Sequence, residues 1–128
     1  MGTNVLIVDD FQTMRKVIRK SVVLSGFEVG DFWEAGNGKD ALTIIHSQKV
    51  DVILTDLNMP EMNGLEMFLK IQQEEKYRHI PVIFITSQGS EAMVQEGLQQ
   101  GVQGYIQKPF HPEAIRDVLL KTIGKNHD

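Results

Sequence analysis

The chain has 128 residues, 41% of them hydrophobic and 23% charged, and a formal net charge of −4. This length and balance are typical of one compact globular domain, so we expect a single domain over residues 1–128 and no second domain. The acidic charge argues against nucleic-acid binding, and the absence of cysteine excludes disulfides and thiolate chemistry. The lack of a membrane-length stretch or signal peptide predicts a cytoplasmic protein with no membrane partner. We also expect a monomer.

The first 47 residues predict two strands and two helices. Residues 4–10 read as a short apolar strand that ends in two acids. The hydrophobic period then becomes helical, and Ser25-Gly26 ends this helix. Its apolar side is predicted to hold Phe11, Met14, Ile18 and Val22, and its solvent side Arg15, Lys16, Arg19 and Lys20. A second strand is expected within residues 27–35, centred on 31–34 and including Trp33 in a structural role. A helix over residues 39–46 follows a glycine-rich turn.

The second half repeats this alternation. A β-branched run over residues 50–56 is typical of a central parallel strand, and it ends in Asp56. The later elements are predicted as a helix over 63–73, a strand over 81–86, a helix over 90–100, a strand over 104–108 and a helix over 112–124. The helix over residues 90–100 has few apolar side chains, so we expect it to be thinly packed and mobile.

Five strands alternating with five helices predict an α/β three-layer sandwich with a parallel sheet and right-handed crossovers. The order of the strands depends on the acids. Asp9 and Asp10 follow the first strand, and Asp56 ends the third. These acids can act together only if the first and third strands are neighbours. We therefore predict a (βα)5 sheet of order 2-1-3-4-5, the flavodoxin-like arrangement.

Polar side chains are predicted at the carboxyl ends of four strands, the edge where ligands bind in open parallel sheets. They are Asp9, Asp10, Asp56, Thr86 and Lys108. Taken singly, each has an ordinary structural explanation, such as Asp56 capping the following turn. Their shared location is harder to explain by solvation alone. Three crowded carboxylates need compensation, and Mg²⁺ provides it because it prefers oxygen ligands.

The charges suggest the chemistry. Three carboxylates, one lysine and one Mg²⁺ sum to zero, which suits a phosphoryl group, whose transfer depends on positioning and charge stabilisation. By chemical type we assign Asp56 as the nucleophile that takes the phosphoryl group as an acyl phosphate. Asp9 and Asp10 would hold the metal, and Lys108 and Thr86 would contact phosphoryl oxygens.

Several motifs together resemble the response-regulator receiver domain of two-component signalling. They are Asp9-Asp10, Asp56-Leu57-Asn58-Met59-Pro60 with Gly64 behind it, Thr86-Ser87 and Lys108-Pro109-Phe110. The resemblance covers residues 4–124, and the combination is highly specific. Within the family the chain is most similar to the chemotaxis (CheY-like) type, on Asp9-Asp10-Phe11, Thr13-Met14-Arg15 and Gly104-Tyr105.

The resemblance implies a role for each motif residue. Asp56 would accept phosphate from a CheA-like sensor histidine kinase. The implied ligands of Mg²⁺, or of Mn²⁺ in its place, are Asp9, Asp10, Asp56 and the main-chain carbonyl of Asn58. The implied phosphate and switch residues are Thr86, Ser87, Lys108 and Tyr105, with Thr86 and Tyr105 moving as a pair. Asn58 and Gln88 would tune dephosphorylation, and a cis peptide bond would join Lys108 to Pro109.

The resemblance also implies a stand-alone regulator that catalyses only its own phosphorylation and dephosphorylation. Phosphorylation would shift the balance between two conformations. Partners would bind the face made by the fourth helix, fifth strand and fifth helix. The expected output partner is a flagellar motor switch protein or another output protein, with a phosphatase as a further partner.

Three other interpretations compete with this one. A phosphatase of the haloacid dehalogenase type also uses an aspartate and Mg²⁺. Such enzymes have an Asp-x-Asp arrangement after the first strand, whereas Asp9 and Asp10 are adjacent here. A flavin or nucleotide carrier would need a phosphate-cradling loop after the first strand, where these acids would repel phosphate. A phosphorelay intermediate, or a regulator of a non-flagellar process, stays open.

Overall fold

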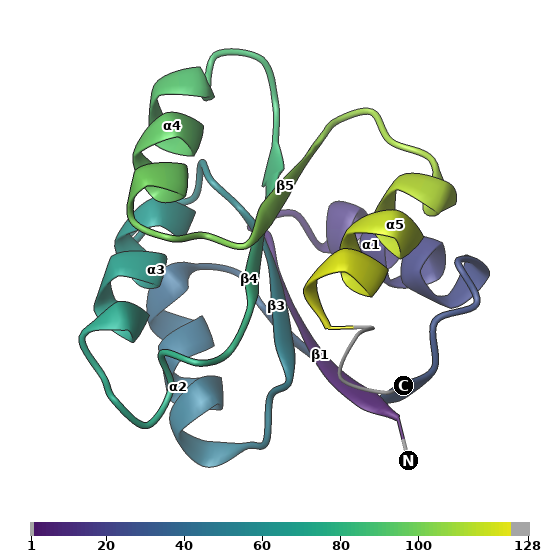
Figure 1. Ribbon diagram of the computed structural model, residues 1–128, viewed down its shortest axis with the longest axis horizontal. Coiled ribbons are helices and arrows are strands. Elements are labelled where there is room, and N and C mark those ends of the chain that lie inside the picture. The colour runs from purple at the N-terminus through teal and green to yellow at the C-terminus, as the bar shows by residue number, and fades with distance from the viewer. Residues whose placement is uncertain (1, 124–128) are drawn as a thin grey trace.

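A computed structural model of the chain describes residues 2–123 (Figure 1). Within these residues five strands alternate with five helices. In chain order they are β1 (Thr3–Val8), α1 (Gln12–Leu24), β2 (Val29–Ala35), α2 (Gly38–Ser47), β3 (Val52–Asp56), α3 (Gly64–Gln72), β4 (Val82–Thr86), α4 (Glu91–Gln99), β5 (Gly104–Gln107) and α5 (Pro112–Thr122). None of the helices in this part of the chain is both long and apolar enough to cross a bilayer.

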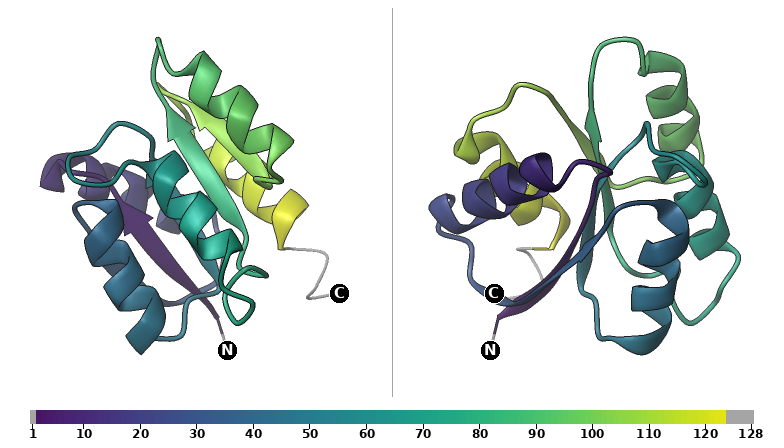
Figure 2. Two further views of the ribbon diagram at one scale, coloured as in Figure 1. Left: turned by 90° about the vertical axis from the view of Figure 1, so that its left-hand side faces the viewer. Right: turned by 180° about the vertical axis from the view of Figure 1, so that it is seen from behind.

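The strands form one parallel sheet in the order β2-β1-β3-β4-β5. Helices α2, α3 and α4 cover one face, and α1 and α5 lie together on the other (Figures 1 and 2). The predicted three-layer α/β fold and its strand order are confirmed.

The sheet is buried on both faces, which explains why its central strands are apolar at nearly every position. Successive side chains of a strand point to opposite faces. In β1, Leu6 and Val8 pack into the core under α2, α3 and α4, whereas Val5 and Ile7 pack into the core under α1 and α5. The two cores clamp β1 and β3 in the middle of the sheet, so the residues that follow these strands are held firmly.

Helix α3 starts directly beside the end of β3. Asn63 caps the helix, its side chain accepting a hydrogen bond from the Glu66 backbone, and Glu66 returns one to the Asn63 backbone. A Cβ on Gly64 would lie 2.3 Å from the carbonyl oxygen of Asp56. Only glycine permits this approach, so the helix holds the loop after Asp56 close to the sheet.

The predicted bounds agree with the observed elements to within two residues, although Gly124, the predicted end of the last helix, lies outside the described residues. Two predictions for α1 are wrong. Phe11 is 68% exposed, because it precedes the first helical turn as the N-cap residue. Arg15 does not lie on the solvent side, since its guanidinium bridges to Glu34 of β2.

Candidate functional site

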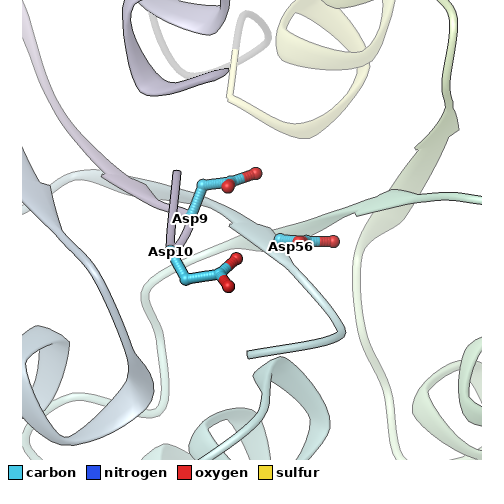
Figure 3. A group of neighbouring side chains, drawn as sticks. All are labelled: Asp9, Asp10 and Asp56. Atoms are coloured by element: carbon cyan, nitrogen blue, oxygen red, sulfur yellow. The ribbon is translucent and has the colours of Figure 1, made fainter. Parts of the chain in front are cut away.

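The ends of β1 and β3 bring three carboxylates together. The strands pair in register, with Val8 opposite Thr55, so the residues that follow them meet at one edge of the sheet. Asp9, Asp10 and Asp56 each offer an oxygen within 4.8 Å of the others, and Figure 3 shows their side chains grouped at this edge. We call these three residues the acidic cluster. Their predicted convergence is confirmed.

Backbone donors and one lysine hold the acidic cluster. Asp9 Oδ1 accepts a hydrogen bond from the Phe11 backbone N–H at 2.9 Å, and Asp56 Oδ1 accepts one from the Leu57 N–H at 2.8 Å. Lys108 Nζ lies 3.4 Å from Asp9 Oδ2 and 3.8 Å from Asp56 Oδ1. The Lys108–Pro109 bond is cis. Lys108, which directly follows β5, therefore lies beside the acidic cluster.

Burial dominates the electrostatics of Asp56, which is only 6% exposed. Desolvation raises the pKa of its carboxyl above the ordinary 3.8, and the negative charge of Asp9 adds to the rise. Lys108 and the backbone N–H groups of Leu57 and Asn58 act in the opposite direction and lower this pKa. The nearby positive charge and hydrogen-bond donors therefore compensate the buried Asp56 carboxylate only in part.

The acidic cluster fits a divalent cation that prefers oxygen ligands. Asp10 Oδ1 is buried and has no hydrogen-bond partner, an arrangement that costs free energy unless something binds there. Three carboxylates face a single lysine, which leaves excess negative charge in a small space. These residues suit Mg²⁺, because Mg²⁺ takes carboxylate oxygens together with water and phosphate oxygens.

The predicted switch residues lie on the next two strands. Thr86, at the end of β4, is 4% exposed, whereas Tyr105 on β5 is 48% exposed. A cavity of about 160 Å³ lies between them and α4, and its lining includes Thr86, Tyr105 and Ser90. Ser87 and Gln88 lie on the exposed loop after β4. The Tyr105 side chain is therefore partly in solvent, and the cavity lies beside the buried Thr86.

Two side chains near the site were missed by the sequence reasoning. Arg15 Nη1 donates to the backbone carbonyl of Asp9 at 2.7 Å, while its Nε pairs with Glu34 at 2.9 Å. Ser90 is 1% exposed and accepts a hydrogen bond from Asn58 Nδ2 at 3.0 Å. The arginine follows the acids at helical spacing, which is a weak signal. Nothing in the sequence pairs Ser90 with a residue 32 positions earlier.

Comparison with known proteins points to one family. The family described as "Response regulator receiver domain" matches residues 5–120. The "Chemotaxis protein CheY homolog" of Campylobacter jejuni is 40% identical over 120 residues, which cover 93% of this chain and 91% of the relative. "Chemotaxis protein CheY1" of Helicobacter pylori is 38% identical over 122 residues, covering 94% and 97%.

Solved structures agree with these sequence relatives. The chemotaxis protein CheY4 of Vibrio cholerae superposes with a TM-score of 0.81 at 31% identity, covering 95% of this chain and 99% of that chain. The receiver domain of the sensor histidine kinase PA1611 from Pseudomonas aeruginosa has a TM-score of 0.81 at 27% identity, covering 97% and 99%. That structure is described with a magnesium ion coordinated in its active-site cleft.

Proposed function

The chain belongs to the family of response regulator receiver domains, and from this premise we propose that Asp56 accepts a phosphoryl group from a histidine kinase in a Mg²⁺-dependent reaction. A response regulator role follows from the family, whereas the phosphoacceptor, the metal ligands and the partners are the substance of the proposal. The observation that supports it best is the convergence of the acidic cluster and Lys108 on one point. The names of the sequence relatives favour chemotaxis as the process.

The proposed step is an in-line phosphoryl transfer. A carboxylate oxygen of Asp56 forms a bond to phosphorus as the bond between phosphorus and a histidine nitrogen breaks, and that nitrogen keeps the electron pair. Lys108, 3.8 Å from Asp56, would pair with one phosphoryl oxygen, and the Thr86 hydroxyl would donate to another. Mg²⁺ would neutralise charge on the phosphoryl oxygens, held by the acidic cluster and the Asn58 main-chain carbonyl. Hydrolysis of the acyl phosphate would reset the protein.

The switch would use the cavity between α4 and β5. A phosphoryl group on Asp56 would draw the Thr86 hydroxyl toward it, and the exposed Tyr105 ring would turn into the vacated space. A ligand shifts such an equilibrium only through its different affinity for the two states. The face of α4, β5 and α5 would then differ between states, so we place the output partner there. A flagellar motor switch protein is the partner that chemotaxis calls for.

Phosphorylation with a small acyl phosphate tests the proposal without the kinase. In the presence of Mg²⁺ the full chain should gain one alkali-labile phosphate, and Asp56→Asn should abolish it. Asp51→Asn is the matched control, because Asp51 lies at the opposite end of β3 and accepts a hydrogen bond from the Asn4 backbone. A label that persists in Asp56→Asn would refute the assignment. Equal capture of motor switch protein by both forms would refute the output role.

A further inference from the structure

Ser90 stands at the start of α4, yet its side chain does not cap that helix. Serine is among the favoured N-cap residues because its oxygen can accept a hydrogen bond from the first turn. Asn37 and Asn63 do this for α2 and α3. The Ser90 side chain makes no such bond, and its hydroxyl is instead the acceptor for Asn58 Nδ2 at 3.0 Å. The buried N-cap residue of α4 therefore forms a hydrogen bond with Asn58 and not with its own helix.

The partner in this contact lies next to the phosphoacceptor. Asn58 is two residues beyond Asp56, and its backbone N–H is one of the two that lower the pKa of the Asp56 carboxyl. Its main-chain carbonyl is also the proposed fourth metal ligand. Because the Asn58 side chain is otherwise exposed, the hydrogen bond to Ser90 is its one polar anchor among the described residues. The bond therefore fixes a residue whose backbone shapes the site.

The other end of the contact belongs to a helix with few buried side chains. Among the residues of α4, Val94 and Gly97 are buried, the latter against the ring of Phe84. Ser90, immediately before the helix, lines the cavity that also borders Thr86 and Tyr105. A change at Ser90 is thus felt both by the loop after Asp56 and by the cavity proposed for the switch.

We propose that Ser90 is a positioning residue, whose hydroxyl holds Asn58 in place for Mg²⁺ binding and couples the start of α4 to the acidic cluster. The inference rests on the proposed function, since it concerns the metal of that site. A ligand group that is already fixed binds with a smaller loss of conformational freedom. By thermodynamic reciprocity, a partner that displaces α4 and breaks this bond would weaken Mg²⁺ binding to the same extent as Mg²⁺ opposes that partner.

The test is a Mg²⁺ titration of the full chain, followed by amide NMR shifts. Ser90→Ala should weaken Mg²⁺ binding about three- to tenfold, the range expected for one neutral hydrogen bond. In the wild type, shifts should extend from the acidic cluster into α4, and in Ser90→Ala they should stop at the site. Asn58→Ala removes the same bond from an exposed position, so it gives the same test should Ser90→Ala fold poorly.

A double-mutant cycle separates the tether from general disturbance. If Ser90 acts through Asn58, the double variant should bind Mg²⁺ no more weakly than either single variant. Ser47→Ala is the control, because Ser47 is exposed and bonds within α2. Unchanged affinity in Ser90→Ala, or single effects that multiply in the double variant, would overturn the inference alone. A wild-type chain that binds no Mg²⁺ would overturn the proposed metal site as well.

Discussion

Replacing Asp56 with asparagine should stabilise the folded protein at neutral pH, although it would destroy the proposed function. The change keeps the shape and an oxygen that accepts from Leu57, but it removes a buried charge. At an effective dielectric constant of about 20, unit charges 3.8 Å apart, the separation of Lys108 Nζ and Asp56 Oδ1, attract each other by about 4.4 kcal/mol.

Desolvation decides the sign of the effect, because burial is the largest of the causes that shift the pKa of Asp56 and this pKa is raised despite the attraction to Lys108. The repulsion from Asp9 acts in the same direction as desolvation. The net cost of keeping the charge is about 1–2 kcal/mol, in the range for a buried polar group that is only partly compensated. For a domain of this size we expect Asp56→Asn to raise Tm by about 3–8 °C without Mg²⁺.

The pH dependence provides the assay. Because burial raises the folded-state pKa of Asp56 above 3.8, the folded protein holds this proton more tightly than the unfolded chain does. The contribution of Asp56 to wild-type stability therefore falls as pH rises from 3.8 through the folded-state pKa. The advantage of Asp56→Asn should be full above that window and vanish below 3.8. Thermal melts from pH 4 to pH 8, with exposed Asp31→Asn as the control, measure it. A pH-independent advantage, or a loss at pH 7, would refute the reasoning.

Three further predictions concern the supports of the site. Arg15→Met removes the donor to the Asp9 carbonyl, so calorimetry should show Mg²⁺ affinity reduced about three- to tenfold, and unchanged affinity would contradict this role. Gly64→Ala should cost about 1–3 kcal/mol in urea unfolding, because the new Cβ would meet the Asp56 carbonyl; wild-type stability would mean that the loop yields freely. Gly97→Ala would meet the Phe84 ring at 2.3 Å, so hydrogen exchange should quicken in α4 and stay unchanged in α1.

The acidic cluster could be predicted because it depends on short-range patterns and one topological rule. Each strand is a run of apolar residues, so its end is visible in the sequence, and parallel strands present their carboxyl ends at one edge. The requirement that Asp9 meet Asp56 then places β1 beside β3, as observed. Residues that directly follow strands inherit their positions from the sheet, which is why Lys108 also lies where it was predicted.

Contacts between loops and between helices and edge strands were not predictable in this way. The Arg15–Glu34 pair depends on how α1 packs beside β2, an edge strand whose mixed exposure hides its alternation. The helical periodicity predicted that Phe11 belongs to the apolar face of α1. The chain turns after Asp9, however, and the Phe11 ring lies in solvent. Such contacts are set by tertiary packing, which no local pattern encodes.

In the proposed switch, the small number of buried side chains on α4 and the uncompensated charge of Asp56 would act together. Moving a two-state equilibrium from 1:99 to 99:1 requires about 5.5 kcal/mol of differential binding. A phosphoryl group with Mg²⁺ can supply this only if the moving element resists little. Helix α4 buries Val94 and Gly97, and the Asn58–Ser90 bond joins its N-cap residue to the loop after Asp56. A net contribution of about 1 kcal/mol from that bond is then a sizeable part of the resistance, so changes at Ser90 should alter signalling more than changes to the well-packed α3.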